Sequence, residues 1–177
     1  MYYTMKSQTE LINQIIAAFA NVERGDGVTL HEARLIDDNC EDRNKYDKAR
    51  KKDTEQNWND IPDDKIIDFG DTLPFLNAEG FRFYLPAFMV YSLNNIELST
   101  YARVAVEMML TFDVEKDNVS FAVEFIKKKT SLLTKEQIDC CINFLEYMME
   151  LGDYYCISSK DIRRSLQVFW YKQDTWG

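Results

Sequence analysis

The most apolar part of the chain is residues 80–94, which read GFRFYLPAFMVYSLN. Only Arg82 is charged, and apolar side chains fall on nearly every face of a helix drawn through this stretch. A helix of this kind is the central one of a bundle, because other elements must cover its whole circumference. Pro86 is expected to kink this helix or to start a new turn. The alternative is a pair of short buried strands, since periodicity separates short apolar runs poorly.

Amphipathic helices are predicted on both sides of this stretch. Three of them begin with capping boxes, in which Ser or Thr is followed three residues later by Glu or Gln. The three pairs are Ser7–Glu10, Thr29–Glu32 and Thr134–Gln137. Gly152 is expected to end the helix that begins at the third box. Ser158 or Ser159 is expected to begin a C-terminal helix at about 159–172.

Glycine and proline are scarce, with 6 Gly and 3 Pro among 177 residues. So few turn-forming residues argue against a many-stranded fold. We therefore predict an all-α fold, a single-domain bundle of six to eight helices over residues 1–177 around the central helix 80–94. A further helix is expected from Ser99 or Thr100, and residues 119–130 fit either a helix or a strand. A charged excursion at about 37–57 is predicted to be an exposed helix or a mobile segment.

The chain is acidic, with a formal net charge of −9, and residues 1–80 carry 17 acidic and 10 basic side chains. This charge repels nucleic acids and anionic membranes and favours a basic protein partner. No apolar run approaches the roughly 18 residues of a membrane-spanning helix. The four cysteines include no CxxC pair, and this pattern is typical of a reducing compartment. We expect a cytoplasmic protein that binds neither nucleic acid nor membrane.

Catalytic motifs are absent from the sequence. His31 is the only histidine, which excludes a zinc site with two histidines. Cys140 and Cys141 lie in an apolar helical stretch, where at least one thiol should be buried and inert. Nucleotide-binding, hydrolase and deaminase signatures do not occur. We therefore predict no catalytic residue, no metal and no cofactor.

Acidic pairs are the strongest candidates for a functional surface. Asp37–Asp38 and Asp63–Asp64 are predicted to lie at helix ends, where acidic side chains destabilise the fold little. Adjacent residues on a helix point in directions too different for either pair to share one catalytic site. Together with a nearby tryptophan they form a predicted partner-binding surface. Its residues are Asp37, Asp38, Glu41, Asp42, Trp58, Asp60, Asp63 and Asp64.

Several segments together resemble an uncharacterised bacterial domain family over roughly residues 10–150. The segments are HEARLIDD at 31–38, DIPD at 60–63, and GFRFYLPAFM at 80–89, with SLLT at 131–134. The resemblance implies a small, acidic, bacterial cytoplasmic protein. It transfers no functional residue, and the tail after Leu151 is not part of it.

We hypothesise an immunity (antitoxin-like) protein, which covers the active site of a cognate basic nuclease-type toxin domain with its acidic surface. The protein is expected to be a monomer or a weak homodimer. One alternative is an enzyme that uses His31 and Glu32, with Asp37 or Asp38, beside Arg82. The other is a non-catalytic adaptor or scaffold.

Overall fold

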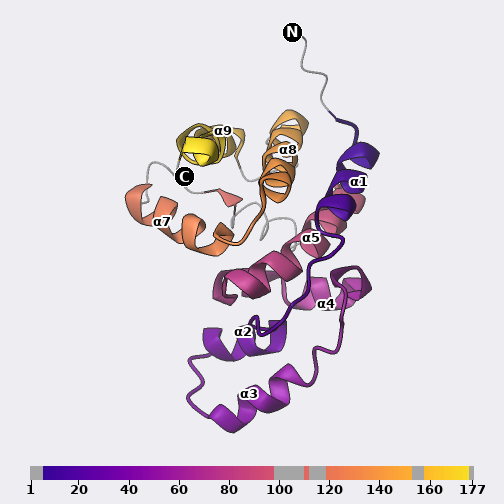
Figure 1. Ribbon diagram of the computed structural model, residues 1–177, viewed down its shortest axis with the longest axis vertical. Helices are drawn as coiled ribbons and strands as arrows, with labels where there is room; N and C mark the ends of the chain where they lie inside the picture. Colours follow the sequence, from indigo (N-terminus) through magenta and orange to yellow (C-terminus); the bar gives the residue numbers. More distant parts are fainter. Residues whose placement is uncertain (1–5, 98–109, 112–118, 153–157, 176–177) are drawn as a thin grey trace.

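The computed structural model describes residues 6–97, 110–111, 119–152 and 158–175 (Figure 1). Within these residues lie eight α-helices, three 3-10 helices and no strand, so the predicted all-α fold is confirmed. The α-helices are α1 (Gln8–Ala18), α2 (Leu30–Asp37), α3 (Arg43–Arg50), α4 (Asp63–Asp68), α5 (Ala78–Asn94), α7 (Val119–Thr130), α8 (Lys135–Leu151) and α9 (Ser159–Val168). The 3-10 helices are η1 (Trp58–Asp60), η2 (Gly70–Phe75) and η3 (Trp170–Thr175). The helix expected from Ser99 or Thr100 falls outside the described residues.

Helix α5 is the centre of the fold, as its composition predicts. It runs between α1, α4 and α7 and also contacts η1 and η2 (Figure 1). Its residues from Gly80 to Met89 are all buried except Arg82, which is half-buried. The alternative of two short strands is wrong, and the helix continues through Pro86 without a break. Apolar residues on the surrounding helices complete a single core cluster around it.

All three capping boxes are confirmed. At α2, the Thr29 hydroxyl accepts a hydrogen bond from the Glu32 N–H at 3.3 Å, and the Glu32 carboxylate accepts one from the Thr29 N–H at 2.8 Å. The other two boxes cap the N-termini of α1 and α8 with the same pair of hydrogen bonds. Residues 119–130 form a helix, which settles the choice between helix and strand.

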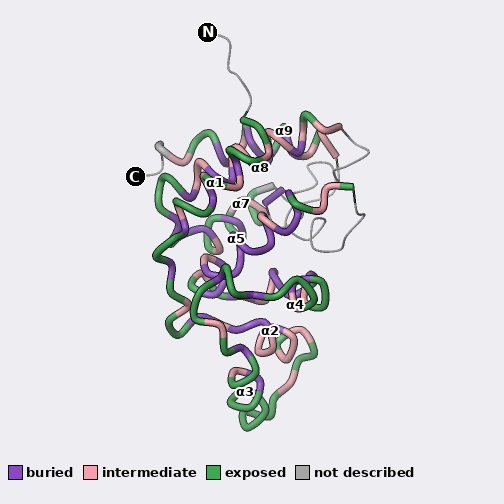
Figure 2. Tube along the Cα trace, turned by 90° about the vertical axis from the view of Figure 1, so that its right-hand side faces the viewer, coloured by how far each residue is buried: buried purple, intermediate pink, exposed green. Residues whose placement is uncertain are grey.

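Helices α2 and α3, with the residues that join them, form one end of the molecule, which we call the α2–α3 lobe (Figures 1 and 2). The lobe spans residues 29–53 and contacts the rest of the fold chiefly through η2. Ala49 is the only buried residue of α3, so the charged excursion predicted at 37–57 contains an exposed helix. Figure 2 shows the contrast with the largely buried α5.

The segment that leads into the lobe touches the start of α5 backbone to backbone. The side-chain oxygen of Asn77, Oδ1, accepts hydrogen bonds from the backbone N–H groups of Val28 and Gly80, at 2.9 and 3.0 Å. A Cβ atom on Gly80 would overlap the carbonyl oxygen of Val28, and one on Gly27 would overlap the backbone nitrogen of Gly80. Glycine at both positions is therefore a condition of this close approach.

None of the helices in the described ranges combines the length and apolar character that crossing a membrane requires.

Candidate functional site

The seven acidic residues of the predicted surface lie at the turn between α2 and α3 and around η1 and α4. Asp37 is half-buried and the other six are exposed. Asp42 caps α3 by accepting the Asn44 N–H at 3.0 Å. Within the described part of the chain, none of these seven carboxylates forms an ion pair. Their negative charge is therefore available to a partner.

The two acidic pairs lie at opposite kinds of helix end. Asp63 and Asp64 occupy the first turn of α4, where the helix dipole favours acids. Asp37 and Asp38 are the last residue and the C-cap of α2, where the helix dipole disfavours acids. The expectation that acids destabilise the fold little at both sites is therefore wrong for this pair. Arg34 is nearby, and its hydrogen bonds to Asp71, with further charge from Asp37 and Asp38, raise the pKa of its guanidinium.

Trp58 does not belong to an exposed surface. Its side chain is 3% exposed, and its indole N–H donates to the Phe19 carbonyl at 2.8 Å. Its position in a connection between helices indicated exposure, but the connection folds back onto the end of α1. Trp58 is therefore a core residue, and it is removed from the predicted partner-binding surface.

A buried carboxylate, Asp53, organises the lobe. One oxygen accepts the His31 backbone N–H and the other accepts the Nδ1–H of the His31 ring, each at 2.9 Å. The Lys65 ammonium lies 3.1 Å from the same carboxylate. Burial by itself would raise the pKa of Asp53, but hydrogen bonds from His31, Thr29 and Lys65 outweigh it and hold the pKa below its ordinary value. Asp53 is therefore an ionised group inside the protein.

Further charged groups surround this carboxylate. Lys65 also bridges to Glu55, and the Arg24 guanidinium donates to the Asp53 carbonyl at 2.8 Å and lies 3.4 Å from the Tyr84 hydroxyl. Burial, and then the charge of Asp53, raise the pKa of Tyr84 to about 12. The network thus connects Asp53 of the lobe to Lys65 of α4 and, through Arg24, to Tyr84 of α5.

The residues of the hypothetical enzyme do not converge. Asp53, and not Glu32, Asp37 or Asp38, holds the His31 ring. Glu32 closes the capping box and pairs with Arg50 at 3.0 Å. The Arg82 side chain points elsewhere and donates to Gln137 at 3.0 Å. Asp53 had no signal in the sequence, because a single acid among charged neighbours does not reveal its burial.

A groove opens between α2 and α3, beside the exposed edge of the His31 ring. Its volume is about 410 Å³, and its lining combines positive and apolar side chains. The lining residues are His31, Arg34, Leu35, Lys45, Lys48, Ala49, Lys52 and Phe69. The Phe69 ring packs against the His31 ring, with centroids 4.5 Å apart, and the Arg34 guanidinium lies 5.4 Å from the Phe69 centroid. The lobe of this acidic protein therefore carries a largely apolar groove that is lined in part by cationic side chains.

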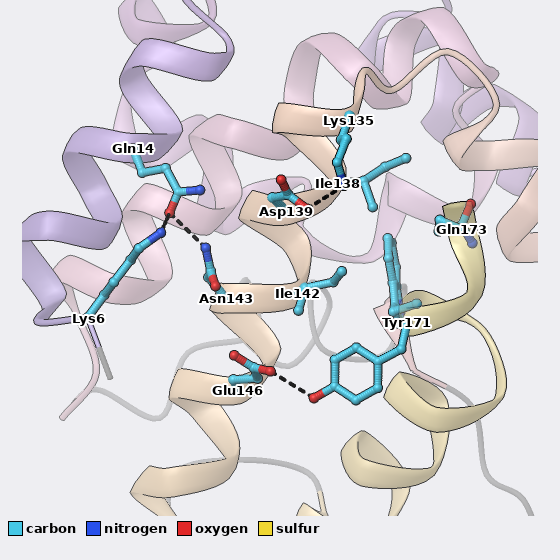
Figure 3. A pocket seen from close by; sticks show the side chains of 11 residues that line it. Lys6, Gln14, Lys135, Ile138, Asp139, Ile142, Asn143, Glu146, Tyr171 and Gln173 are labelled. Atoms are coloured by element: carbon cyan, nitrogen blue, oxygen red, sulfur yellow. Dashed lines mark hydrogen bonds and ion pairs between the residues drawn. The ribbon is translucent and has the colours of Figure 1, made fainter. Parts of the chain in front are cut away.

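A second groove of about 370 Å³ lies between α1, α8 and η3 (Figure 3). Its polar side chains bind one another. Asn143 donates to Gln14 at 2.8 Å, and the Tyr171 hydroxyl donates to Glu146 at 2.7 Å. Figure 3 shows both pairs together with Ile138 and Ile142, which also line the groove. Because its hydrogen-bonding groups are already matched, this groove is a weaker candidate for a ligand site.

Other chemistry is limited in the part of the chain that the structure describes. No group of three or more His, Cys, Asp or Glu residues there could hold a metal ion. Cys140 and Cys141 are both buried, and burial raises the pKa of Cys140 to about 12 and that of Cys141 well above its ordinary value. Neither thiol is therefore an activated nucleophile.

The fold and these grooves define an all-α protein with a charged peripheral lobe. Comparison with protein families adds one finding: residues 7–174 match the family described as "Family of unknown function (DUF6714)". The chain belongs to this family, as the resemblance to an uncharacterised family predicts, and the match extends through the tail that the resemblance left out. No curated protein and no solved structure matches the chain.

Proposed function

We propose that the protein is an immunity protein, a cytoplasmic inhibitor that binds a cognate basic toxin domain of nuclease type and covers its active site. One observation carries the proposal: seven carboxylates of the predicted surface are at least partly exposed and form no ion pair within the described residues. Exposed carboxylates without an ionic partner speed the encounter with a basic protein and orient it.

The position of Asp37 and Asp38 supports a role in binding. Acids at the C-terminal end of a helix are unfavourable by about 0.3–1 kcal/mol each. Arg34 lies close enough to offset them, but both of its terminal nitrogens already donate to Asp71. A pair that stabilises the fold so little is better explained by contact with a partner.

The proposal predicts that a neighbouring gene encodes the basic toxic domain, and that domain is the reagent for the test. The strip variant Asp37→Lys/Asp38→Lys/Asp63→Lys/Asp64→Lys is compared with the control Glu23→Lys/Asp26→Lys/Glu124→Lys/Glu150→Lys, which changes the net charge equally at exposed positions elsewhere. We expect the strip variant to associate with the toxin about tenfold more slowly or worse at low salt, and to lose protection of cells.

The control variant is expected to keep most of its association rate and its protection. Equal behaviour of the two variants would contradict the acidic-surface mechanism. Failure of the unmodified protein to bind or to neutralise that domain would overturn the immunity function itself.

A further inference from the structure

Three lysines gather on the side of the lobe that faces the groove. Lys45 and Lys48 lie on α3 and Lys52 follows it, at spacings of three and four residues that bring them to one side. None of the three ammonium groups forms an ion pair in the described ranges, although the chain has a net charge of −9. Unpaired positive charge at one groove of an acidic protein indicates a site for an anion.

His31 adds an oriented hydrogen-bonding group to the same groove. The ionised Asp53 accepts the Nδ1–H of the ring and so fixes the plane of the imidazole. The histidine side chain is 23% exposed, while Asp53 behind it is fully buried. The remaining ring nitrogen, Nε2, is therefore the atom that the ring can offer to a ligand. A buried carboxylate that positions a histidine distinguishes this groove from a chance group of surface lysines.

The floor of the groove is apolar. Leu35, Ala49 and Phe69 line it, and its volume of about 410 Å³ is within the range of small-molecule sites. A bare inorganic ion would leave most of this apolar surface in contact with water. The groove therefore suits an anion attached to an apolar or aromatic group.

We propose that the groove between α2 and α3 binds a small phosphate monoester with an apolar or aromatic body. A phosphate monoester carries about −1.5 to −2 charges at neutral pH, and the ammonium groups of Lys48 and Lys52 balance that charge more closely than they would balance a single carboxylate. Lysine is a common phosphate ligand in proteins. The ester group rests on Leu35, Ala49 and Phe69, and the phosphate faces Lys48, Lys52 and His31.

This site is independent of the proposed immunity function, because it uses charge of the opposite sign on different residues. The strip variant leaves all lining residues of the groove in place. Loss of toxin binding and loss of phosphate-ester binding are therefore separate results.

The experiment titrates the full-length protein with phenyl phosphate, inorganic phosphate and benzyl alcohol, followed by NMR and calorimetry. His31 is the only histidine, so its ring resonances report on this groove without ambiguity. We expect phenyl phosphate to shift these resonances saturably. Inorganic phosphate should bind about tenfold more weakly or less, because it leaves the apolar floor uncovered, and benzyl alcohol should not bind measurably.

Two charge-matched variants complete the test. Lys48→Gln/Lys52→Gln is expected to weaken phenyl phosphate binding about tenfold or more, since it removes two charge-assisted contacts. Arg43→Gln/Lys51→Gln removes equal charge from exposed positions outside the groove and should change binding less than about twofold. Absence of a saturable shift, equal effects of the two variants, or inorganic phosphate binding as tightly as phenyl phosphate would each overturn the proposal.

Discussion

The central helix α5 and the α2–α3 lobe are stabilised by different interactions. Side chains such as Phe81 and Phe88 in α5 are fully buried among other apolar groups. In the lobe, the buried residues include a carboxylate, Asp53, which holds His31 and Lys65 through hydrogen bonds and charge. Apolar burial is indifferent to pH, whereas a buried ion pair depends on it. The stability of the lobe should therefore depend on pH through Asp53, whereas the apolar packing around α5 should not.

The largest expected effect is in the core. Phe88→Ala removes a fully buried ring from α5 and leaves a cavity, so we expect a loss of about 3–5 kcal/mol in the free energy of unfolding. Urea denaturation should give a similar loss at pH 7 and in mild acid. The control Ile67→Ala truncates a side chain that is 48% exposed and should cost less than about 1 kcal/mol. A loss for Phe88→Ala that varies strongly with pH would contradict the contrast between the two regions.

The corresponding change in the lobe is Asp53→Asn, which removes the carboxylate that Lys65 and His31 share. Breaking a buried ion pair costs about 3 kcal/mol or more, and we expect that loss at neutral pH. The pKa of Asp53 is lower in the folded state than its ordinary value of about 4. Its contribution is therefore complete above about pH 4 and is lost as the pH falls through the folded-state pKa.

Urea denaturation from about pH 6 to about pH 3 measures this dependence. The difference between wild type and Asp53→Asn should shrink toward the acid end. Asp71→Asn serves as the control, because the ion pair of Asp71 with Arg34 is partly exposed and contributes about 1 kcal/mol or less. A difference for Asp53→Asn that stays constant over the whole range would show that its charge does not stabilise the lobe.

The capping boxes allow the same motif to be compared in the two regions. Thr134→Ala at α8 removes an N-cap and should cost about 1 kcal/mol. Thr29→Ala at α2 removes an N-cap and also a hydrogen bond to Asp53, so we expect a larger cost of about 2 kcal/mol. Thermal or urea unfolding of the two variants measures the difference. Equal costs would mean that Thr29 acts only as a cap.

A second pH-dependent effect concerns Lys129, a lysine of α7 that donates to the carbonyl oxygens of Pro74 and Leu76. Burial, and then the charge of Lys128, lower the pKa of Lys129 to about 8. The folded state therefore releases this proton more readily than the unfolded chain does. Stability should rise as the pH increases from about 8 toward the ordinary lysine pKa of about 10.4.

Lys129→Met removes this titration. The free energy of unfolding of wild type should therefore rise relative to that of the variant as the pH increases over that range. Subtracting the variant cancels the titration of other groups. Lys127→Met, in which Lys129 remains, is the matched control on the same helix. A difference that does not vary with pH would contradict the assignment.

Local patterns in the sequence predicted the helices well. The capping boxes and the apolar length of 80–94 concern residues close in sequence, so their outcome depends little on the rest of the fold. Residues 119–130 were ambiguous because their alternating apolar side chains fit a strand as well as a helix.

The organisation of the lobe could not be predicted in the same way. The network joins His31, Asp53 and Lys65, which are far apart in sequence and have ordinary charged neighbours. Charge patterns show how many acids are present but not which one the fold buries. Trp58 shows the converse error, since a residue in a short connection returned to the core.

The contact of Gly27 with Gly80 has a consequence for other members of the family. Because a side chain at either position would collide with the backbone of the other segment, neither position can carry a side chain while this junction is kept. A family member that carries a larger residue at one of them must have moved its lobe away from the central helix. Such a sequence would identify a relative whose lobe is oriented differently.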